Sequence, residues 1–208
     1  MNGVTKPYLF RKKMSRRLKI QENLDAKGLI TEEAHRPYRT IVTTNHEIKE
    51  YGILADSIAF GVFLDKAMTV SCPGANLESL ASDNILKDFQ KRGVTKLAIC
   101  GGTNNLVKKN KSVTDVVDIT PGLEALVTKY KEAGFNVVVV KVTGRAGHKE
   151  EIKELNKAFR KMAKTLNVES HNSRKFSTKY LCKDGLHPDP DEIHRLSRDF
   201  YDALSKLC

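Results

Sequence analysis

Asn136-Val137-Val138-Val139-Val140-Lys141-Val142 is the stretch that decides the fold. Its four consecutive valines leave no polar side for solvent, which is typical of a strand buried on both faces of a parallel sheet. A half-exposed strand alternates apolar and polar residues instead. The run therefore predicts a parallel sheet with helices on both faces.

Other short apolar runs flank this one, and helical patterns separate them. An apolar stripe at helical spacing is clearest in residues 120–134, 152–162 and 193–207. Strands that alternate with helices favour right-handed crossovers and a three-layer α/β/α sandwich. We therefore expect an α/β fold of flavodoxin-like type with a central parallel sheet of about five strands. These strands are residues 51–55, 67–71, 96–100, 136–142 and 168–171.

Polar turns follow three of these strands directly. Ser57 comes after the first strand, Cys72-Pro73-Gly74-Ala75 after the second, and Gly101-Gly102-Thr103-Asn104-Asn105 after the third. Parallel strands end at one edge of a sheet, and ligands bind there in open α/β folds. We expect Ser57, Gly74 and Asn104 to lie near one another.

A fourth block, Cys182-Lys183-Asp184-Gly185-Leu186-His187-Pro188-Asp189, precedes the last helical pattern. Asp184 and His187 are separated by a glycine turn, and this spacing lets the carboxylate reach one ring nitrogen and fix the tautomer of the imidazole. Such a pair can activate a serine hydroxyl, which is too weak an acid to attack an ester without a base.

Together the four blocks resemble the SGNH (GDSL-type) hydrolase family over residues 50 to 207. The basic character of the chain is similar to the retrotransposon-encoded or RNA-binding (Oskar-like) intracellular branch of that family. The resemblance implies a serine esterase that cleaves small acyl esters, with Ser57 as nucleophile, His187 as general base and Asp184 as its orienting group. It also implies an oxyanion hole made by the backbone N–H groups of Ser57 and Gly74 and the side-chain amide of Asn104.

Each of these residues also has a purely structural interpretation. Ser57 could cap a helix, Gly74 and Asn104 could serve only their turns, and His187 could be a structural histidine beside Pro188. The sequence also departs from the family pattern twice. Ala55 stands where the family has glycine, which predicts strain if that position needs a positive φ, and Asn105 replaces the usual aspartate.

The formal net charge of +11 suggests a second function. A basic surface favours a polyanionic partner such as RNA, DNA or an anionic membrane surface, although it can also be merely solvated. The alternative hypothesis is therefore an RNA-binding module built on an SGNH-like scaffold. Residues 1–19 hold seven basic side chains and no acidic one: Lys6, Arg11, Lys12, Lys13, Arg16, Arg17 and Lys19.

The first part of the chain does not share the resemblance. Residues 11–24 predict a basic helix, residues 30–33 the start of a short helix capped by Thr31, and residues 39–44 an extended segment. We therefore divide the chain into a basic N-terminal appendage, residues 1–49, and an SGNH-hydrolase-like domain, residues 50–208. The appendage either packs on this domain or reaches toward a partner.

Composition bounds the remaining possibilities. The 208 residues suit one domain, and 40% hydrophobic with 29% charged residues is typical of a globular protein. The four cysteines have no metal-ligand spacing, so we expect neither a metal nor a cofactor. No apolar run approaches the ~20 residues of a membrane span, and the first residues lack the apolar region of a secretory signal. These features predict a cytoplasmic or nuclear protein.

Overall fold

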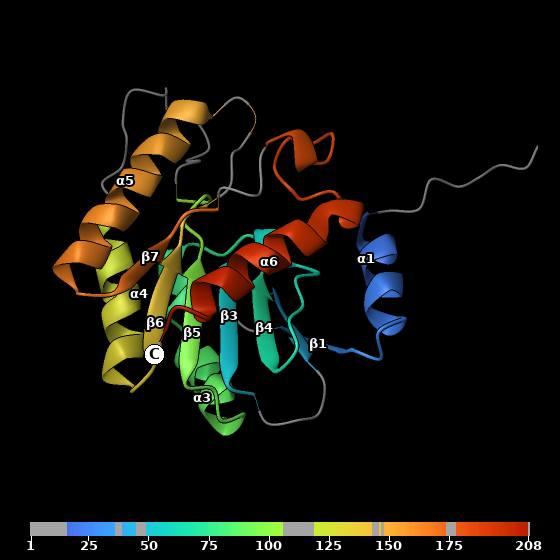
Figure 1. Ribbon diagram of the computed structural model, residues 1–208, viewed down its shortest axis with the longest axis horizontal. Coiled ribbons are helices and arrows are strands. Elements are labelled where there is room, and N and C mark those ends of the chain that lie inside the picture. The colour runs from blue at the N-terminus through green and yellow to red at the C-terminus, as the bar shows by residue number, and fades with distance from the viewer. Residues whose placement is uncertain are drawn as a thin grey trace, which may run out of the picture.

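The computed structural model describes residues 16–35, 39–44, 49–105, 119–142, 146, 148–173 and 178–207. Within these residues one seven-stranded sheet has the order β1-β2-β4-β3-β5-β6-β7 (Figure 1). Its strands are β1 (Ile30–His35), β2 (Arg39–Thr44), β3 (Tyr51–Asp56), β4 (Ala67–Cys72), β5 (Lys96–Cys100), β6 (Asn136–Val140) and β7 (Glu169–His171).

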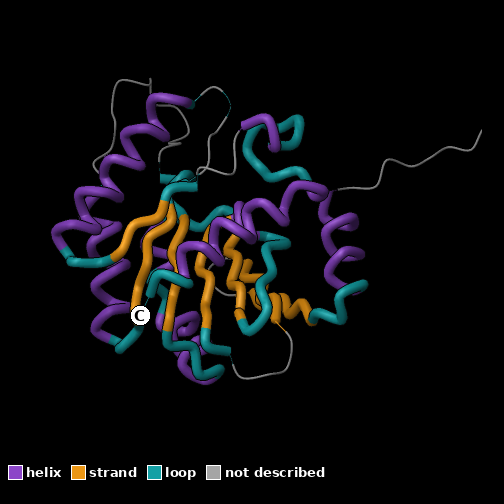
Figure 2. Tube along the Cα trace, viewed as in Figure 1, coloured by secondary structure: helices purple, strands orange, loops and turns teal. Residues whose placement is uncertain are grey.

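The five strands from β3 to β7 are parallel and confirm the predicted α/β fold. β3 lies between β4 and β5, with Ile53 paired to Thr69 on one side and to Ala98 on the other. The segments that follow β3, β4 and β5 therefore lie side by side at the carboxyl ends of these strands (Figure 2).

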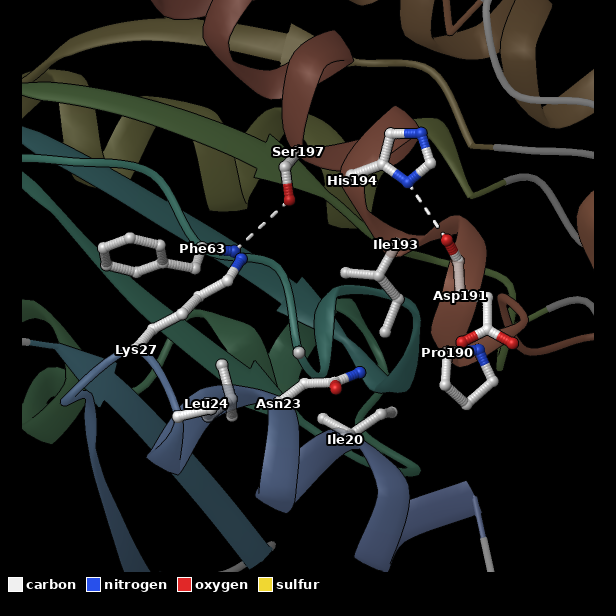
Figure 3. Close-up of a pocket in the computed structure, with 12 residues that line it drawn as sticks. Ile20, Asn23, Leu24, Lys27, Phe63, Pro190, Asp191, Ile193, His194 and Ser197 are labelled. Atoms are coloured by element: carbon white, nitrogen blue, oxygen red, sulfur yellow. Dashed lines mark hydrogen bonds between the residues drawn. The ribbon is translucent and has the colours of Figure 1, made fainter.

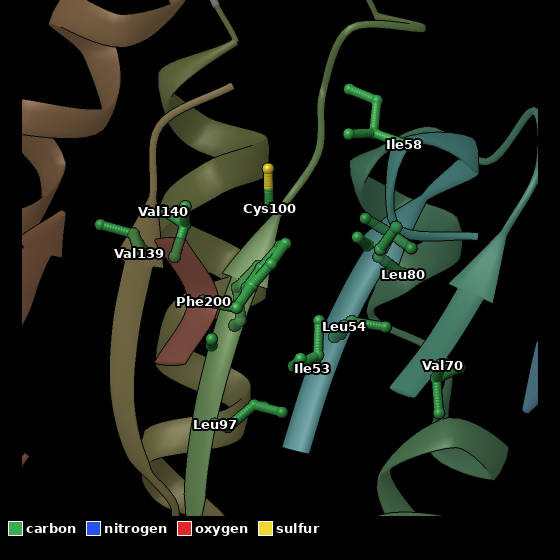
Figure 4. Close-up of a cluster of buried hydrophobic side chains, with 14 of the residues drawn as sticks. Ile53, Leu54, Ile58, Val70, Leu80, Leu97, Cys100, Val139, Val140 and Phe200 are labelled. Carbon is green, nitrogen blue, oxygen red and sulfur yellow. The ribbon is translucent and has the colours of Figure 1, made fainter. Parts of the chain in front are cut away.

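The valine run forms the buried strand that its composition predicts. Val137 to Val140 are each at most 2% exposed, and Ile53 and Leu54 of β3 are fully buried. Figure 4 shows side chains of β3, β5 and β6 packed with Phe200 of the last helix in a single hydrophobic core. The sheet is therefore covered along its central strands.

Helices cover the two faces of the sheet. In Figure 1, α6 crosses the front of the strands, and α3 and α4 lie behind them. Phe89 of α3, Tyr130 of α4 and nearby Phe135 pack edge to face in the rear layer. The α-helices are α1 (Arg16–Asp25), α2 (Leu77–Leu80), α3 (Asp83–Lys91), α4 (Thr120–Glu132), α5 (Lys149–Thr165) and α6 (Ile193–Leu204), with single 3-10 turns η1 (Ser57–Ala59), η2 (Thr178–Tyr180) and η3 (Pro190–Glu192).

The sheet extends beyond the parallel strands into the N-terminal part of the chain. β1 pairs antiparallel with β2, and β2 pairs antiparallel with β4. The predicted helix at residues 30–33 is wrong, because these residues form β1, whose Ile30 pairs with Thr44. Pairing with a neighbouring strand outweighs a weak local capping signal there. The predicted extended segment at residues 39–44 is confirmed.

The N-terminal helix of the described residues is α1, which begins at Arg16. Residues 11–15 of the predicted basic helix, and with them Lys12 and Lys13, lie outside the described part of the chain, as does Lys6. The boundary between residues 49 and 50 stays a prediction. No helix in the described ranges is both long enough and apolar enough to cross a membrane.

Candidate active site

Ser57 begins the single 3-10 turn η1 that follows β3. Its neighbour Asp56, which is fully buried, caps this turn by accepting a hydrogen bond from the Ile58 N–H at 3.0 Å. Asp56 is the capping residue, so the interpretation of Ser57 as a helix cap does not hold. The hydroxyl of Ser57 is left available for another partner.

Asp56 also joins the turn after β3 to the turn after β5. Its second carboxylate oxygen accepts a hydrogen bond of 2.8 Å from the hydroxyl of Thr103, which is itself buried. The hydroxyl of Ser71, at the end of β4, donates to the Asp56 carbonyl at 2.9 Å. These buried hydrogen bonds fix the ends of three adjacent strands relative to one another.

The turn that carries His187 is organised by Asp184. One carboxylate oxygen accepts hydrogen bonds from the backbone N–H groups of Leu186 and His187 at 2.9 and 3.0 Å. The other lies 2.8 Å from Nδ1 of the His187 ring. Gly185 makes the tight turn possible, because its φ of +66° favours glycine. Backbone and side chain of His187 are thus both tied to one carboxylate.

The two segments meet at a hydrogen bond between residues far apart in sequence. Nε2 of His187 lies 2.9 Å from Oγ of Ser57. Since Nδ1 donates its proton to Asp184, Nε2 is left with the lone pair that accepts the serine proton. Asp184, His187 and Ser57 therefore form a continuous hydrogen-bonded chain, with the geometry needed to activate a hydroxyl.

The Asp184 carboxylate is ionised across the ordinary pH range. Partial burial acts to raise its pKa, but hydrogen bonds from the His187 N–H, the His187 ring and the Leu186 N–H outweigh this and lower the pKa to about 2. A charged acceptor keeps the proton on Nδ1 of His187.

Gly74 and Asn104 lie in the turns after β4 and β5. The side-chain amide of Asn104 donates a hydrogen bond of 2.8 Å to the carbonyl of Ala75, the residue after Gly74. One N–H of that amide remains for another acceptor. Gly74 is exposed, with φ +79° and open space around it, and its N–H has no acceptor among the described residues. Two potential donors thus belong to turns that are bonded to each other.

Solved structures with the same fold are numerous, although no family model and no curated protein matches the sequence. A GDSL-like lipase from Bacteroides thetaiotaomicron aligns with a TM-score of 0.64 and 14% identity, over 93% of this chain and all of the other. A lipase/acylhydrolase from Enterococcus faecalis aligns with a TM-score of 0.59 and 16% identity, over 77% and 97% of the two chains. The protein has the GDSL (SGNH) hydrolase fold.

Another structure with this fold is a carbohydrate esterase family 3 protein from Talaromyces cellulolyticus. It aligns with a TM-score of 0.59 and 15% identity, over 76% of this chain and 97% of the other. At such identities the likeness establishes the GDSL fold but assigns no residue a role. The retrotransposon-encoded or RNA-binding branch stays a prediction.

The departures from the GDSL sequence pattern are both accommodated. Ala55 lies in the regular strand β3, and the non-glycine residues with positive φ in the described chain are Lys66 and Asn167. The strain expected at Ala55 is therefore absent. Asn105 accepts a hydrogen bond of 3.1 Å from the N–H of Leu77, the first residue of α2. Its side chain thus satisfies one of the free donors at that helix start.

The basic side chains proposed to bind nucleic acid lie apart from this arrangement. Arg16 donates to the Pro188 carbonyl at 3.0 Å, and Lys19 pairs with Asp191 at 2.5 Å. Arg17 is exposed on α1. Lys6, Arg11, Lys12 and Lys13 are outside the described residues. Because Arg16 and Lys19 are engaged within the molecule, the described residues give RNA binding no support.

Sequence reasoning missed the contacts of three residues near the site. The link between Asp56 and Thr103 could not be predicted, because their hydrogen bond joins turns on different strands. Arg16 was assigned to a nucleic-acid surface because basic clusters carry no information about packing. In the described part of the chain, no three His, Cys, Asp or Glu side chains form a group that could hold a metal ion.

Proposed function

We propose that the protein is a serine hydrolase that cleaves small acyl esters through a covalent acyl-enzyme. The observation that carries the proposal is the hydrogen-bonded chain from Asp184 through His187 to Ser57, with distances of 2.8 and 2.9 Å. Its position at the carboxyl ends of parallel strands, in a GDSL fold, supports the same assignment. The names of the similar structures, lipase, acylhydrolase and esterase, agree with ester substrates.

In the first half of the reaction, Oγ of Ser57 attacks the ester carbonyl while Nε2 of His187 takes the hydroxyl proton. The resulting imidazolium is stabilised by the charged carboxylate of Asp184. The tetrahedral intermediate then expels the alcohol, which receives the proton from His187. An acyl group remains bonded to Ser57.

In the second half, His187 takes a proton from a water molecule that attacks the acyl-enzyme. Collapse of this second intermediate breaks the bond to Ser57, returns the proton to Oγ and releases the carboxylic acid. The free hydroxyl and neutral imidazole are thereby restored.

The negative charge that develops on the carbonyl oxygen needs fixed donors. We assign these to the N–H groups of Ser57 and Gly74 and to the amide of Asn104. Ser57 is the first residue of a 3-10 turn, so its N–H has no acceptor within that turn. Loss of one such donor typically lowers kcat by about 10²–10³.

Covalent labelling tests the proposal directly. A fluorophosphonate should label the wild-type protein, which should also hydrolyse p-nitrophenyl acetate, and Ser57→Ala should lose both reactions. Ser205→Ala is the matched control, because Ser205 is exposed at the end of α6 and should leave both unchanged. A folded wild-type protein that neither reacts with the label nor cleaves the ester would overturn the assignment.

A further inference from the structure

Helix α1 contacts both segments that carry the Ser57–His187 pair. Ile20, which is 1% exposed, packs against Gly61 in the loop after Ser57 and lies near Ile193, at the start of α6. A Cβ on Gly61 would come within 2.7 Å of Ile20 and 2.8 Å of Ile193. Figure 3 shows Ile20 and Leu24 of α1 facing the first residues of α6. The helix thus lies where the two segments come together.

Apolar packing alone leaves this contact incomplete. A cavity of about 350 Å³ lies between α1, the loop at Gly61 and Phe63, and the segment from Pro190 to Ser197. This pocket opens to solvent, so the side chains on its opposite walls do not contact one another across it. Polar contacts at the N-terminal end of α1 therefore matter more for its position.

Arg16 makes a polar contact with each segment. Its Nε–H donates to the carbonyl of Pro188, the residue directly after His187, at 3.0 Å. Its guanidinium also lies 5.9 Å from the ring centre of Phe60, whose N–H donates to the Ser57 carbonyl. One side chain thus contacts a neighbour of each partner in the 2.9 Å hydrogen bond between Ser57 and His187.

The guanidinium of Arg16 is largely buried and lies near acidic groups. Burial lowers the pKa of the guanidinium, whereas Cys182, Asp184 and Asp189 act in the opposite direction. Nη2 of Arg16 is buried and finds no hydrogen-bond partner among the described residues. An arginine placed only for solubility would remain exposed, because burying an incompletely paired charge is costly.

We propose that Arg16 is a positioning residue that holds the His187 turn and the Ser57 turn at the separation their hydrogen bond requires. It acts through Pro188 and Phe60 and touches no substrate. The proposal rests on the proposed hydrolase function for its kinetic consequence. Misplacement of catalytic groups by about 1 Å can cost about 100-fold in rate, so a supporting contact of this kind is consequential.

The test compares Arg16→Met and Arg16→Lys with Lys27→Met in the full chain. Lys27 is an exposed cation just after α1, so its replacement controls for lost charge. We expect Arg16→Met to lower kcat for p-nitrophenyl acetate by about 10- to 100-fold with KM within about twofold. Arg16→Lys should recover only part of kcat, because lysine lacks the planar guanidinium. Lys27→Met should match the wild type.

Nuclear magnetic resonance of the His187 ring provides a second readout that needs no turnover. In the wild type, the Nδ1 proton bonded to Asp184 should give one low-field signal, and Arg16→Met should shift or broaden it while Lys27→Met does not. An unchanged His187 signal in folded Arg16→Met, or an unchanged kcat, would overturn the role of Arg16. A wild-type protein without activity overturns the hydrolase proposal instead, and the ring signal still decides the role of Arg16.

Discussion

Asp184 uses its two carboxylate oxygens for different purposes. Oδ1 accepts hydrogen bonds from two backbone N–H groups and so shapes the turn, whereas Oδ2 accepts the hydrogen bond from Nδ1 of His187. Asparagine can keep the first set of contacts through its carbonyl oxygen. It would then present an N–H to the ring and favour the wrong tautomer of His187.

We therefore predict that Asp184→Asn lowers kcat by about 10³–10⁴ while the fold persists. Asp65→Asn, at an exposed carboxylate in the loop after η1, should leave kcat unchanged. Ester hydrolysis and thermal unfolding of the three proteins check this outcome. A kcat for Asp184→Asn within tenfold of the wild type would contradict the orienting role of Asp184.

The lowered pKa of Asp184 also sets the pH dependence of its contribution to stability. Because the pKa falls from 3.8 to about 2 on folding, the charged carboxylate stabilises the native state above pH ~4. That contribution is lost as the pH falls toward 2. The difference in unfolding free energy between wild type and Asp184→Asn should shrink between pH ~4 and ~2, as urea unfolding at several pH values would show.

Asn104 and Asn105 are adjacent but should respond differently to alanine. Asn104→Ala removes a proposed oxyanion donor and should lower kcat by about 10²–10³. Asn105→Ala removes the acceptor for Leu77 N–H and should lower stability by about 1 kcal/mol, with a smaller effect on kcat. Steady-state kinetics and thermal unfolding separate the two. Equal losses of kcat would contradict the distinction.

At the scale of residues, the sequence predicted which side chains could carry the chemistry. It did not predict the contacts that hold those side chains in place. Ser57, His187 and Asp184 could be proposed because few residue types form such a chain, and the structure brings them together. Ala55 would be strained only at a positive φ, and it has none because it lies in the regular strand β3, which the sequence pattern alone could not settle. The contact of Arg16 with Pro188 joins residues 172 positions apart, and no local pattern encodes it.

At the scale of elements, periodicity identified the parallel strands and the main helices. It failed at β1, where Ile30 and Thr31 were interpreted as a helix start. The β-branched side chains of these residues favour a strand once a partner such as β2 is present. The structure of a short segment without a clear apolar periodicity depends on the strands with which it pairs.

Two glycines near α1 allow a matched test of how this helix is seated. Gly61 and Gly28 both have positive φ, so alanine costs about 1–2 kcal/mol at either position. Only at Gly61 would the new Cβ also meet Ile20 and Ile193, which adds about 1–3 kcal/mol. Gly61→Ala should therefore be clearly less stable than Gly28→Ala in urea unfolding. Equal destabilisation would mean that α1 is not packed on Gly61.

At the scale of the molecule, one hydrophobic core includes residues from both sides of the predicted boundary at residue 50. Ile20 and Leu24 of α1 belong to the same cluster as Leu54 of β3. The sequence left open whether this basic segment packs on the domain or reaches toward a partner, because its composition describes its charge and not its contacts. We therefore expect α1 to unfold together with the sheet.

A single tryptophan can test this cooperativity, since the chain has none. Leu18 is 57% exposed on α1, so Leu18→Trp places a fluorescent probe there with little disturbance. Its fluorescence and the far-ultraviolet circular dichroism should show coincident urea transitions. A fluorescence transition at lower urea would mean that the N-terminal segment is an independent unit.

The hydrogen bond between Ser57 and His187 spans 130 positions of sequence. Contacts of such long range close late, because the loop entropy must first be overcome by the rest of the sheet. Reactivity at Ser57 would consequently appear only in polypeptides that have finished folding. In a refolding time course, the fraction of protein labelled by the fluorophosphonate would therefore report the fraction of fully folded molecules.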